Sequence, residues 1–295
     1  MNIGIWANTS KQSFWDLLPE VLPWLQDRGQ EVYLTQRIET LWQEKQSHHY
    51  SVIESADDFL KLDFLFAMGG DGTILSAARA VGARQTPILG VHLGGFGFLA
   101  EGTVENLYSR LESVIEGNYT TYPRMVISAK IDDGNKAVTA LNDLVIDIGE
   151  GFRLMKCSLY TGGRLVTSYS ADGLIISTPT GSTAYNLAAG GPIITPVLSL
   201  FTVTPICPHT LSSRPIVLPT ESALTITFPD GEPGARLTAD GQVEHPISQG
   251  GKVVITKADY EVQMVTFEDR DYFQTLRTKM GWGQHDGERN SDGAD

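Results

Sequence analysis

The feature that most constrains the fold of this sequence is a glycine-rich segment between an apolar run and a helical stretch. The apolar run at residues 64–68 ends abruptly at Gly69-Gly70-Asp71-Gly72-Thr73, and the alanine-rich stretch 74–81 that follows has the composition of a helix. Glycines at a strand end let a ligand approach the backbone, and the first turn of a helix offers unpaired N–H groups to an anion. We therefore expect a strand–turn–helix unit with an anion site at its turn.

The sequence around this unit repeats the alternation of strands and helices. We expect strands at 3–7, 31–35 and 87–91, and helices at 14–27 and 104–117, from the spacing of their apolar residues. A second glycine cluster, at 94–97, follows the strand at 87–91. The pattern is typical of an open α/β sheet, and we assign residues 1–121 to an α/β N-terminal domain.

From residue 122 the pattern changes to short strands separated by turn residues. Runs at 125–131, 144–148, 154–160, 174–178, 223–228 and 252–257 predict a β-rich domain over 122–272. A helix is expected at 272–281, and we expect the segment 273–282 to pack back on the first domain. Residues 283–295 are polar and poor in apolar residues, which predicts a disordered tail.

Charge and composition exclude several classes of protein. Against 22 Lys and Arg the chain carries 35 Asp and Glu, a net charge of −13, so we expect neither nucleic-acid nor anionic-membrane binding. No stretch approaches the ~18 apolar residues of a membrane helix, and the N-terminal residues do not have the pattern of a signal peptide. These observations favour a soluble cytoplasmic protein, in which the two cysteines would be free thiols.

Asp71 is the strongest catalytic candidate. A carboxylate in an anion-binding turn repels the ligand, so its presence suggests a chemical role. It could be the general base for an attacking hydroxyl, or it could bind that hydroxyl or Mg²⁺. The alternative is a plain strand–turn–helix connection with an Asp in its turn. The segment is not a Walker A loop, because no Gly-Lys-Ser or Gly-Lys-Thr occurs in the chain.

The second glycine cluster also has two interpretations. Gly95-x-Gly97-x-x-Ala100 fits a loose dinucleotide fingerprint. However, it follows the fourth expected strand, and Phe96 and Phe98 would crowd a pyrophosphate. We favour a second glycine-lined wall of the same cleft, in which Phe98 packs on a purine.

Two segments of the β-rich part could bind the rest of a nucleotide. Asn142 and Asp143 precede a strand, and their amide and carboxylate can hold the vicinal hydroxyls of a ribose, although both residues also open turns. The segment from Pro179 to Asn186 is rich in small and hydroxyl residues. There we expect Ser182 or Thr183 to cap a short helix and to leave an anion or amide site; the alternative is an ordinary capped helix.

Other catalytic patterns are missing from the sequence. It contains no Gly-x-Ser-x-Gly, no His-Glu-x-x-His and no Cys-x-x-Cys, and its six histidines show no ligand spacing. We therefore expect no protein-built metal site.

Taken together, these segments resemble the NAD kinase family. The resemblance extends from residue 3 to about residue 282 and rests on five motifs, at 69–73, 142–143, 172–185, 208–215 and 278–282. It implies a two-domain fold, with an α/β first domain and a sandwich-like second domain. It also implies that NAD lies between the two, often with help from a neighbouring subunit, in a homo-oligomer that is a dimer or a tetramer.

The resemblance further implies the reaction and its residues. A divalent metal cation, Mg²⁺, would act with ATP, and polyphosphate is an alternative donor; Asp71 would accept the proton of the 2′-hydroxyl of the adenosine ribose. The implied NAD-binding residues are Asp71, Gly72, Phe98, Asn142, Asp143, Arg153, Ser170, Asp172, Thr183, Ala184, Tyr185, Asn186, Leu187, Ala188 and Gln242. Ser170 stands where some relatives have a basic residue, and the residue types at positions 153 and 170 vary among relatives.

Two other functions compete with this one. A lipid or sphingoid kinase would share the glycine–aspartate turn, but it would not account for the long 172–185 motif. A catalytically inactive NAD(P)-binding regulator would have no need of Asp71.

Overall fold

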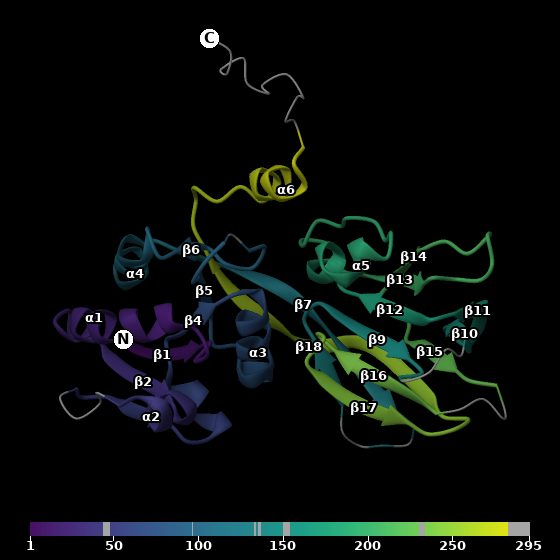
Figure 1. The fold of residues 1–295 in the computed structure, drawn as a ribbon, viewed down its shortest axis with the longest axis horizontal. Helices are drawn as coiled ribbons and strands as arrows, with labels where there is room; N and C mark the ends of the chain where they lie inside the picture. Colours follow the sequence, from purple (N-terminus) through teal and green to yellow (C-terminus); the bar gives the residue numbers. More distant parts are fainter. Residues whose placement is uncertain are drawn as a thin grey trace, which may run out of the picture.

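The computed structural model describes residues 1–282 except 44–47, 96, 133, 135, 136, 150–153 and 230–233. In the N-terminal half, parallel strands alternate with helices, as predicted (Figure 1). The elements of this half are β1 (Asn2–Ala7), α1 (Gln12–Gln26), β2 (Glu31–Thr35), α2 (Gln36–Leu41), β3 (Ser51–Ile53), the 3₁₀ turn η2 (Ala56–Lys61), β4 (Phe64–Gly69), α3 (Asp71–Val81), η3 (Gly82–Arg84), β5 (Ile88–His92), β6 (Gly102–Thr103) and α4 (Leu107–Ile115).

Burial explains why these elements form. All six residues of β4 are buried, as expected for a central strand of a parallel sheet that is covered on both faces. Helix α1 buries Phe14, Leu18, Val21, Leu22 and Leu25, one apolar stripe at helical spacing, in the core that contains β1 and β4 residues. The strand order β5-β4-β1-β2-β3 is parallel throughout, so the carboxyl ends of these strands lie along one edge.

The C-terminal half is built of antiparallel strands. Its elements are β7 (Thr120–Ile131), β8 (Val138–Ala140), β9 (Asp143–Asp147), β10 (Met155–Thr161), β11 (Arg164–Ala171), β12 (Gly173–Ser177), η4 (Thr180–Thr183), α5 (Tyr185–Ala188), β13 (Leu200–Ile206), β14 (Ile216–Pro219), β15 (Leu224–Thr227), β16 (Ala235–Ala239), β17 (Val243–Ile247), β18 (Lys252–Thr266) and α6 (Tyr272–Met280). Six strands form one sheet in the order β14-β13-β12-β9-β16-β17, and the others belong to a second sheet.

The two sheets share one core. Its buried residues come from β9, β12, β13 and β16 of the six-stranded sheet and from β7, β10, β15 and β18 of the other, so the sheets pack face to face. This is the sandwich-like arrangement that the resemblance implied. Of the two cysteines, both free, Cys157 lies in this core and Cys207 is exposed.

Strand β18 joins the two halves of the molecule. It pairs with β15 and β7 in the β-rich half, and at Met264 it pairs in parallel with Ile88 of β5, so one sheet of twelve strands runs through both halves. The sequence predicted only 252–257, because the polar stretch from Lys257 to Glu261 breaks the alternation. The register shifts at this stretch and the strand then continues.

After β18 the chain turns at 267–271 into α6, which Figure 1 shows at the junction of the two halves, and Thr275 and Leu276 of this helix are buried. The predicted disordered tail at 283–295 lies outside the described residues. No helix in the described part of the chain has both the length and the apolar composition needed to cross a membrane.

Candidate active site

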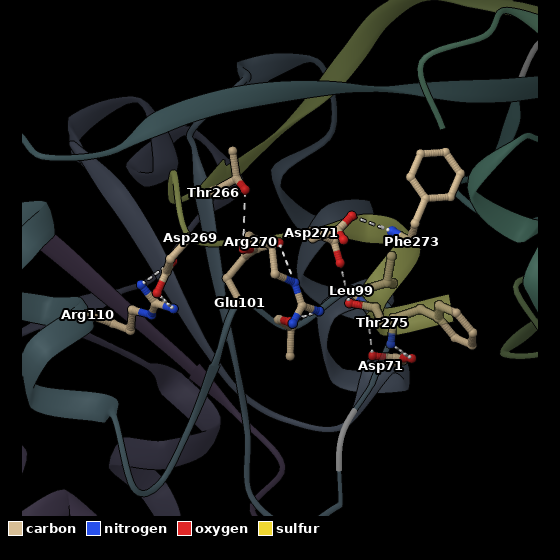
Figure 2. Close-up of polar contacts among 12 residues, drawn as sticks. Asp71, Leu99, Glu101, Arg110, Thr266, Asp269, Arg270, Asp271, Phe273 and Thr275 are labelled. Atoms are coloured by element: carbon tan, nitrogen blue, oxygen red, sulfur yellow. Dashed lines mark hydrogen bonds and ion pairs between the residues drawn. The ribbon is translucent and has the colours of Figure 1, made fainter. Parts of the chain in front are cut away.

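The glycine–aspartate turn connects β4 to α3. The helix begins at Asp71, three residues earlier than the sequence suggested, with Gly70 as its N-cap. Both oxygens of the Asp71 carboxylate accept backbone N–H groups from the two residues directly after the second glycine cluster: Oδ2 from Phe98 at 2.9 Å and Oδ1 from Leu99 at 3.2 Å (Figure 2). The two segments singled out in the sequence therefore meet at this carboxylate.

Gly97 makes this approach possible. A Cβ atom at position 97 would lie 2.1 Å from Oδ1 of Asp71 and 2.8 Å from its Cγ, much closer than any real Cβ contact. Only glycine leaves room for the carboxylate against the backbone here. Two N–H donors thus fix the orientation of the Asp71 carboxylate, which lies against the backbone of Gly97 because this residue has no side chain.

A polar cavity of about 580 Å³ lies on one side of the turn. It is formed where the parallel strands end, by residues after β1, at the end of β2 and in the Gly70–Thr73 turn, as is common for ligand sites of α/β sheets. Lys11, Arg37 and Arg79 line it, and the buried Nη1 atom of Arg79 has no hydrogen-bond partner. This arrangement suits a polyanionic ligand. Sequence reasoning missed these three cations, which belong to no motif and are brought together only by the fold.

Gln242 connects the turn to the β-rich half. Its side-chain amide donates to the carbonyl of Gly72 at 2.8 Å. Asp240, two residues earlier, has a left-handed backbone (φ 51°), and its carboxylate accepts the backbone N–H groups of Leu141, Asn142 and Asp143 at 2.7–3.3 Å. One turn thus holds both the Gly72 segment and the Asn142–Asp143 segment. Sequence reasoning missed Asp240; the Asp240-Gly241 dipeptide, a turn signal, could have indicated it.

Asn142 and Asp143 are buried in this arrangement. Asp143 is only 4% exposed, and its pKa is raised to about 7, first by burial and then by the negative charge of Asp240. The Oδ1 atom of Asn142 is buried and has no hydrogen-bond partner. An acceptor in this state gains a hydrogen bond when a ligand presents an O–H or N–H group.

The 178–188 segment packs directly on Asn142. The N–H of Thr178 donates to the Asn142 carbonyl at 2.8 Å, and a Cβ at Gly181 would lie 2.1 Å from that carbonyl oxygen. The predicted capping by Ser182 or Thr183 is wrong: the N-cap of α5 is Ala184, without a side-chain bond. Instead, Ser182 Oγ donates to the Pro179 carbonyl and accepts the N–H of Ile194, because a tertiary partner satisfies it better.

The predicted residues of α5 and its start differ in exposure. Asn186 is fully buried, and its amide group bonds the carbonyls of Ser182 and Pro192 and the hydroxyl of Thr204. Its side chain therefore holds the turn together. Tyr185 is 47% exposed. Thr183, Ala184, Leu187 and Ala188 keep partial or full exposure and are open to a ligand.

Three predicted residues are not part of this cluster. Asp172 precedes the end of β12 that pairs with Asp147, whereas Asp143 pairs with Ser177 at the other end. At about 3.3 Å per residue, Asp172 lies five residues, or roughly 17 Å, along the strand from the level of Asp143. Ser170 is on β11, where its carbonyl accepts the N–H of His209. Arg153 lies outside the described residues.

Within the described part of the chain, no three His, Cys, Asp or Glu side chains are grouped so that they could hold a metal ion. Asp71 lies between Gly70 and Gly72, which line the cationic cavity of Lys11, Arg37 and Arg79, and its carboxylate is the acidic group nearest in sequence to that cavity. The site thus combines a phosphate-compatible cavity, a fixed carboxylate and the buried polar acceptors of Asn142 and Asp143, a set of groups that suits phosphoryl transfer.

Comparisons with known proteins agree with this class. Residues 3–119 match the model of the ATP-NAD kinase N-terminal domain, and residues 141–267 match that of the ATP-NAD kinase C-terminal domain. The chain is 39% identical to an NAD kinase of Geobacter sulfurreducens over 96% of this chain and 99% of the relative, and 40% identical to an NAD kinase of Syntrophotalea carbinolica with the same coverage.

Solved structures show the same fold. A yeast NADH kinase complexed with NADH superimposes with a TM-score of 0.86 at 25% identity, covering 97% of this chain and 89% of the other. An NAD kinase from Archaeoglobus fulgidus, in complex with ATP, gives a TM-score of 0.74 at 24% identity, covering 95% of this chain and 99% of the other. The chain belongs to the NAD kinase family, and the enzyme class and two-domain fold predicted from the sequence are confirmed.

Proposed function

We propose that the chain transfers the γ-phosphoryl group of ATP to the 2′-hydroxyl of the adenosine ribose of NAD, which yields NADP. The observation that carries this proposal is the position of Asp71. Its carboxylate is fixed by the N–H groups of Phe98 and Leu99. Its neighbours Gly70 and Gly72 line the cationic cavity, and Gln242, which donates to the Gly72 carbonyl, belongs to the turn that holds the Asn142–Asp143 segment.

NAD would bind on the side of the β-rich half. Asn142 offers an unpartnered buried oxygen and Asp143 a buried carboxyl, both suited to ribose hydroxyls or to an amine. Phe98 would pack on the purine, with Thr183 to Ala188 as the opposite wall. The family membership and the likeness to a yeast NADH kinase complexed with NADH support a dinucleotide as a substrate.

The triphosphate of ATP would occupy the cationic cavity. Lys11, Arg37 and Arg79 supply charge, and Gly72 in the first turn of α3 supplies a backbone N–H group. These groups replace the lysine of a Walker A loop, which the sequence lacks. A polyphosphate chain would meet the same cations, so this cavity suits both donors.

The reaction then follows from the geometry of Asp71. The 2′-oxygen attacks the γ-phosphorus as the bond to the β-phosphate oxygen breaks, and the hydroxyl proton passes to the Asp71 carboxylate while ADP leaves. A positioned base of this kind contributes typically about 10²–10⁴ in rate. Because two N–H groups hold the carboxylate, it needs little reorganisation at the moment of transfer.

Mg²⁺ fits this site as a companion of ATP. Magnesium is usually bound by one or two carboxylates together with substrate phosphates, and Asp71, whose neighbours Gly70 and Gly72 line the cavity, would supply one such carboxylate. When bound, the metal would neutralise charge on the triphosphate. The residues of this chain would orient both substrates and accept the proton.

Ser170 and Asp172 would act from a second subunit. Asp172 lies too far along β12 from Asn142 to meet the same ligand within one chain, and Ser170 lies on the neighbouring part of the chain, in β11; both would reach the site of a neighbour in a homodimer or homotetramer. The resemblance implied help from a neighbouring subunit.

The test is an activity assay with three acceptors. The purified protein is incubated with ATP and Mg²⁺ plus NAD, diacylglycerol or sphingosine, and NADP is measured with an NADP-specific dehydrogenase. Of the three acceptors, we expect only NAD to be phosphorylated, which yields NADP. Phosphorylation of a lipid would favour the lipid kinase, and NAD binding without turnover would favour an inactive regulator. A parallel reaction with polyphosphate in place of ATP identifies the donor.

A further inference from the structure

Four consecutive residues after Gly97 connect Asp71 to a buried ion pair. The N–H groups of Phe98 and Leu99 hold the Asp71 carboxylate, and the next two residues, Ala100 and Glu101, are held by Arg270 (Figure 2). Nη2 of Arg270 donates to the Ala100 carbonyl at 3.1 Å, while its Nε lies 3.5 Å from Oε1 of Glu101.

Glu101 is itself fixed on both sides. Its backbone N–H donates to the Gly90 carbonyl of β5 at 3.0 Å, and its Oε2 accepts the hydroxyl of Thr266, the last residue of β18, at 3.2 Å. The side chains of Arg270 and Glu101 are only 16% and 10% exposed. Burial raises the pKa of Glu101 to about 7 in spite of the attraction of Arg270. A charged pair that is costly to bury and is joined to the catalytic segment suggests a positioning role.

We propose that Arg270, with Glu101, is a positioning residue that holds segment 98–101 so that its N–H groups keep the Asp71 carboxylate aligned for phosphoryl transfer. Arg270 comes from the turn between β18 and α6, almost 200 positions later in the chain than Asp71. The return of the C-terminal segment to the first half of the molecule would thus complete the catalytic site. This inference rests on the role of Asp71 in the proposed function.

The geometry requires an arginine. A guanidinium group reaches a carbonyl and a carboxylate at the same time through its planar fork, whereas a lysine offers a single compact charge. The neighbouring pair Arg110–Asp269 provides a contrast: both of its hydrogen bonds are 2.9 Å, and Asp269 is 67% exposed. Asp269 lies in the same turn as Arg270, but its bonds to Arg110 join that turn to α4 and not to the 98–101 segment.

The test compares Arg270→Ala and Arg270→Lys with the control Asp269→Asn. For both Arg270 variants we expect kcat to fall about 10- to 100-fold, the effect of a misplaced catalytic group, while KM for ATP and KM for NAD change by less than about threefold. Asp269→Asn should keep wild-type kcat. Arg270 also lines a cavity of about 270 Å³ next to Phe98, so millimolar guanidinium should partly restore the kcat of Arg270→Ala.

A double-mutant comparison separates positioning from a merely structural role. In an Asp71→Asn background, Arg270→Ala should cause almost no further loss of kcat, because its effect passes through the carboxylate. Equal losses in both backgrounds, or a wild-type kcat for Arg270→Ala, would overturn the proposal. If Asp71→Asn itself retains wild-type turnover, the base assignment fails and the positioning role fails with it. A loss in Asp71→Asn without a loss in Arg270→Ala refutes only the positioning.

Discussion

Replacing Gly97 by alanine would test the geometry at Asp71 with a single methyl group. The added Cβ would lie 2.1 Å from Oδ1, 2.8 Å from Cγ and 3.0 Å from Oδ2 of Asp71. To reach an ordinary contact, the carboxylate or the backbone at position 97 must move by roughly 1 Å, since carbon contacts are optimal near 3.5 Å or more. A displacement of this size can cost about 10²-fold in rate, so we expect kcat to fall by that factor.

The matched control is Gly95→Ala, two residues away in the same cluster. A Cβ at position 95 meets no atom within 4 Å, so this variant should keep turnover near the wild-type value. Both kinetic constants are measured by NADP formation, with circular dichroism and thermal midpoints to establish that both variants fold. A Gly97→Ala protein that folds and turns over like the control would show that the position of the Asp71 carboxylate does not set the rate.

Three further predictions address NAD binding, ATP binding and the pH dependence of stability. Asn142→Ala should lower the affinity for NAD about tenfold, the value of one hydrogen bond, and leave the affinity for ATP unchanged, both measured by calorimetry. An equal loss of affinity for the two ligands would contradict the assignment. Arg37→Met should raise KM for ATP about tenfold. The control is Arg28→Met, which should leave KM for ATP unchanged because Arg28 pairs with Glu112 outside the cavity. Because the pKa of Glu101 is raised from 4.5 to about 7, the folded protein holds an extra proton between these values, and the free energy of unfolding falls as pH rises through them. Urea unfolding at pH 5 and pH 8 should show Glu101→Gln losing about 3 kcal/mol less than the wild type; identical losses would contradict the raised pKa.

Local sequence patterns predicted much of the fold, where the apolar period is clear. The strand at β4 and the helices α1 and α6 were expected within a few residues of their bounds. Strands of polar sequence, such as β11 and β17, were missed because one of their faces is solvent-exposed and their alternation is weak. Strands β13, β14 and β16 were also not predicted. The length of β18 depended on pairing with β7 and β5, which no local pattern contains.

The candidate site likewise contains residues that local sequence patterns indicate and residues that only the fold brings together. Glycine-rich and Asn–Asp segments stand out in a sequence because their residue types have special backbone or hydrogen-bonding properties, and so Asp71, Asn142 and the 178–188 segment could be proposed as candidates from the sequence. Arg79 and Arg270 are ordinary residues of a helix and a turn, and only the fold brings them to the cavity and to the 98–101 segment. Asn186 shows the opposite case: its motif suggested a ligand contact, while its amide is occupied inside the protein.

The most direct test of the account is the rate of phosphoryl transfer in Asp71→Asn. Asparagine keeps the size of the side chain and removes nearly all its basicity. In a single-turnover experiment with saturating ATP, Mg²⁺ and NAD, we expect the transfer rate to fall at least about 100-fold, with NAD affinity in calorimetry changed by less than about threefold. Recovery of the rate at raised Mg²⁺ would make Asp71 a metal ligand instead of a base. A folded Asp71→Asn protein with a near-wild-type transfer rate would contradict the central claim, because this cleft would then not depend on Asp71 for phosphorylation.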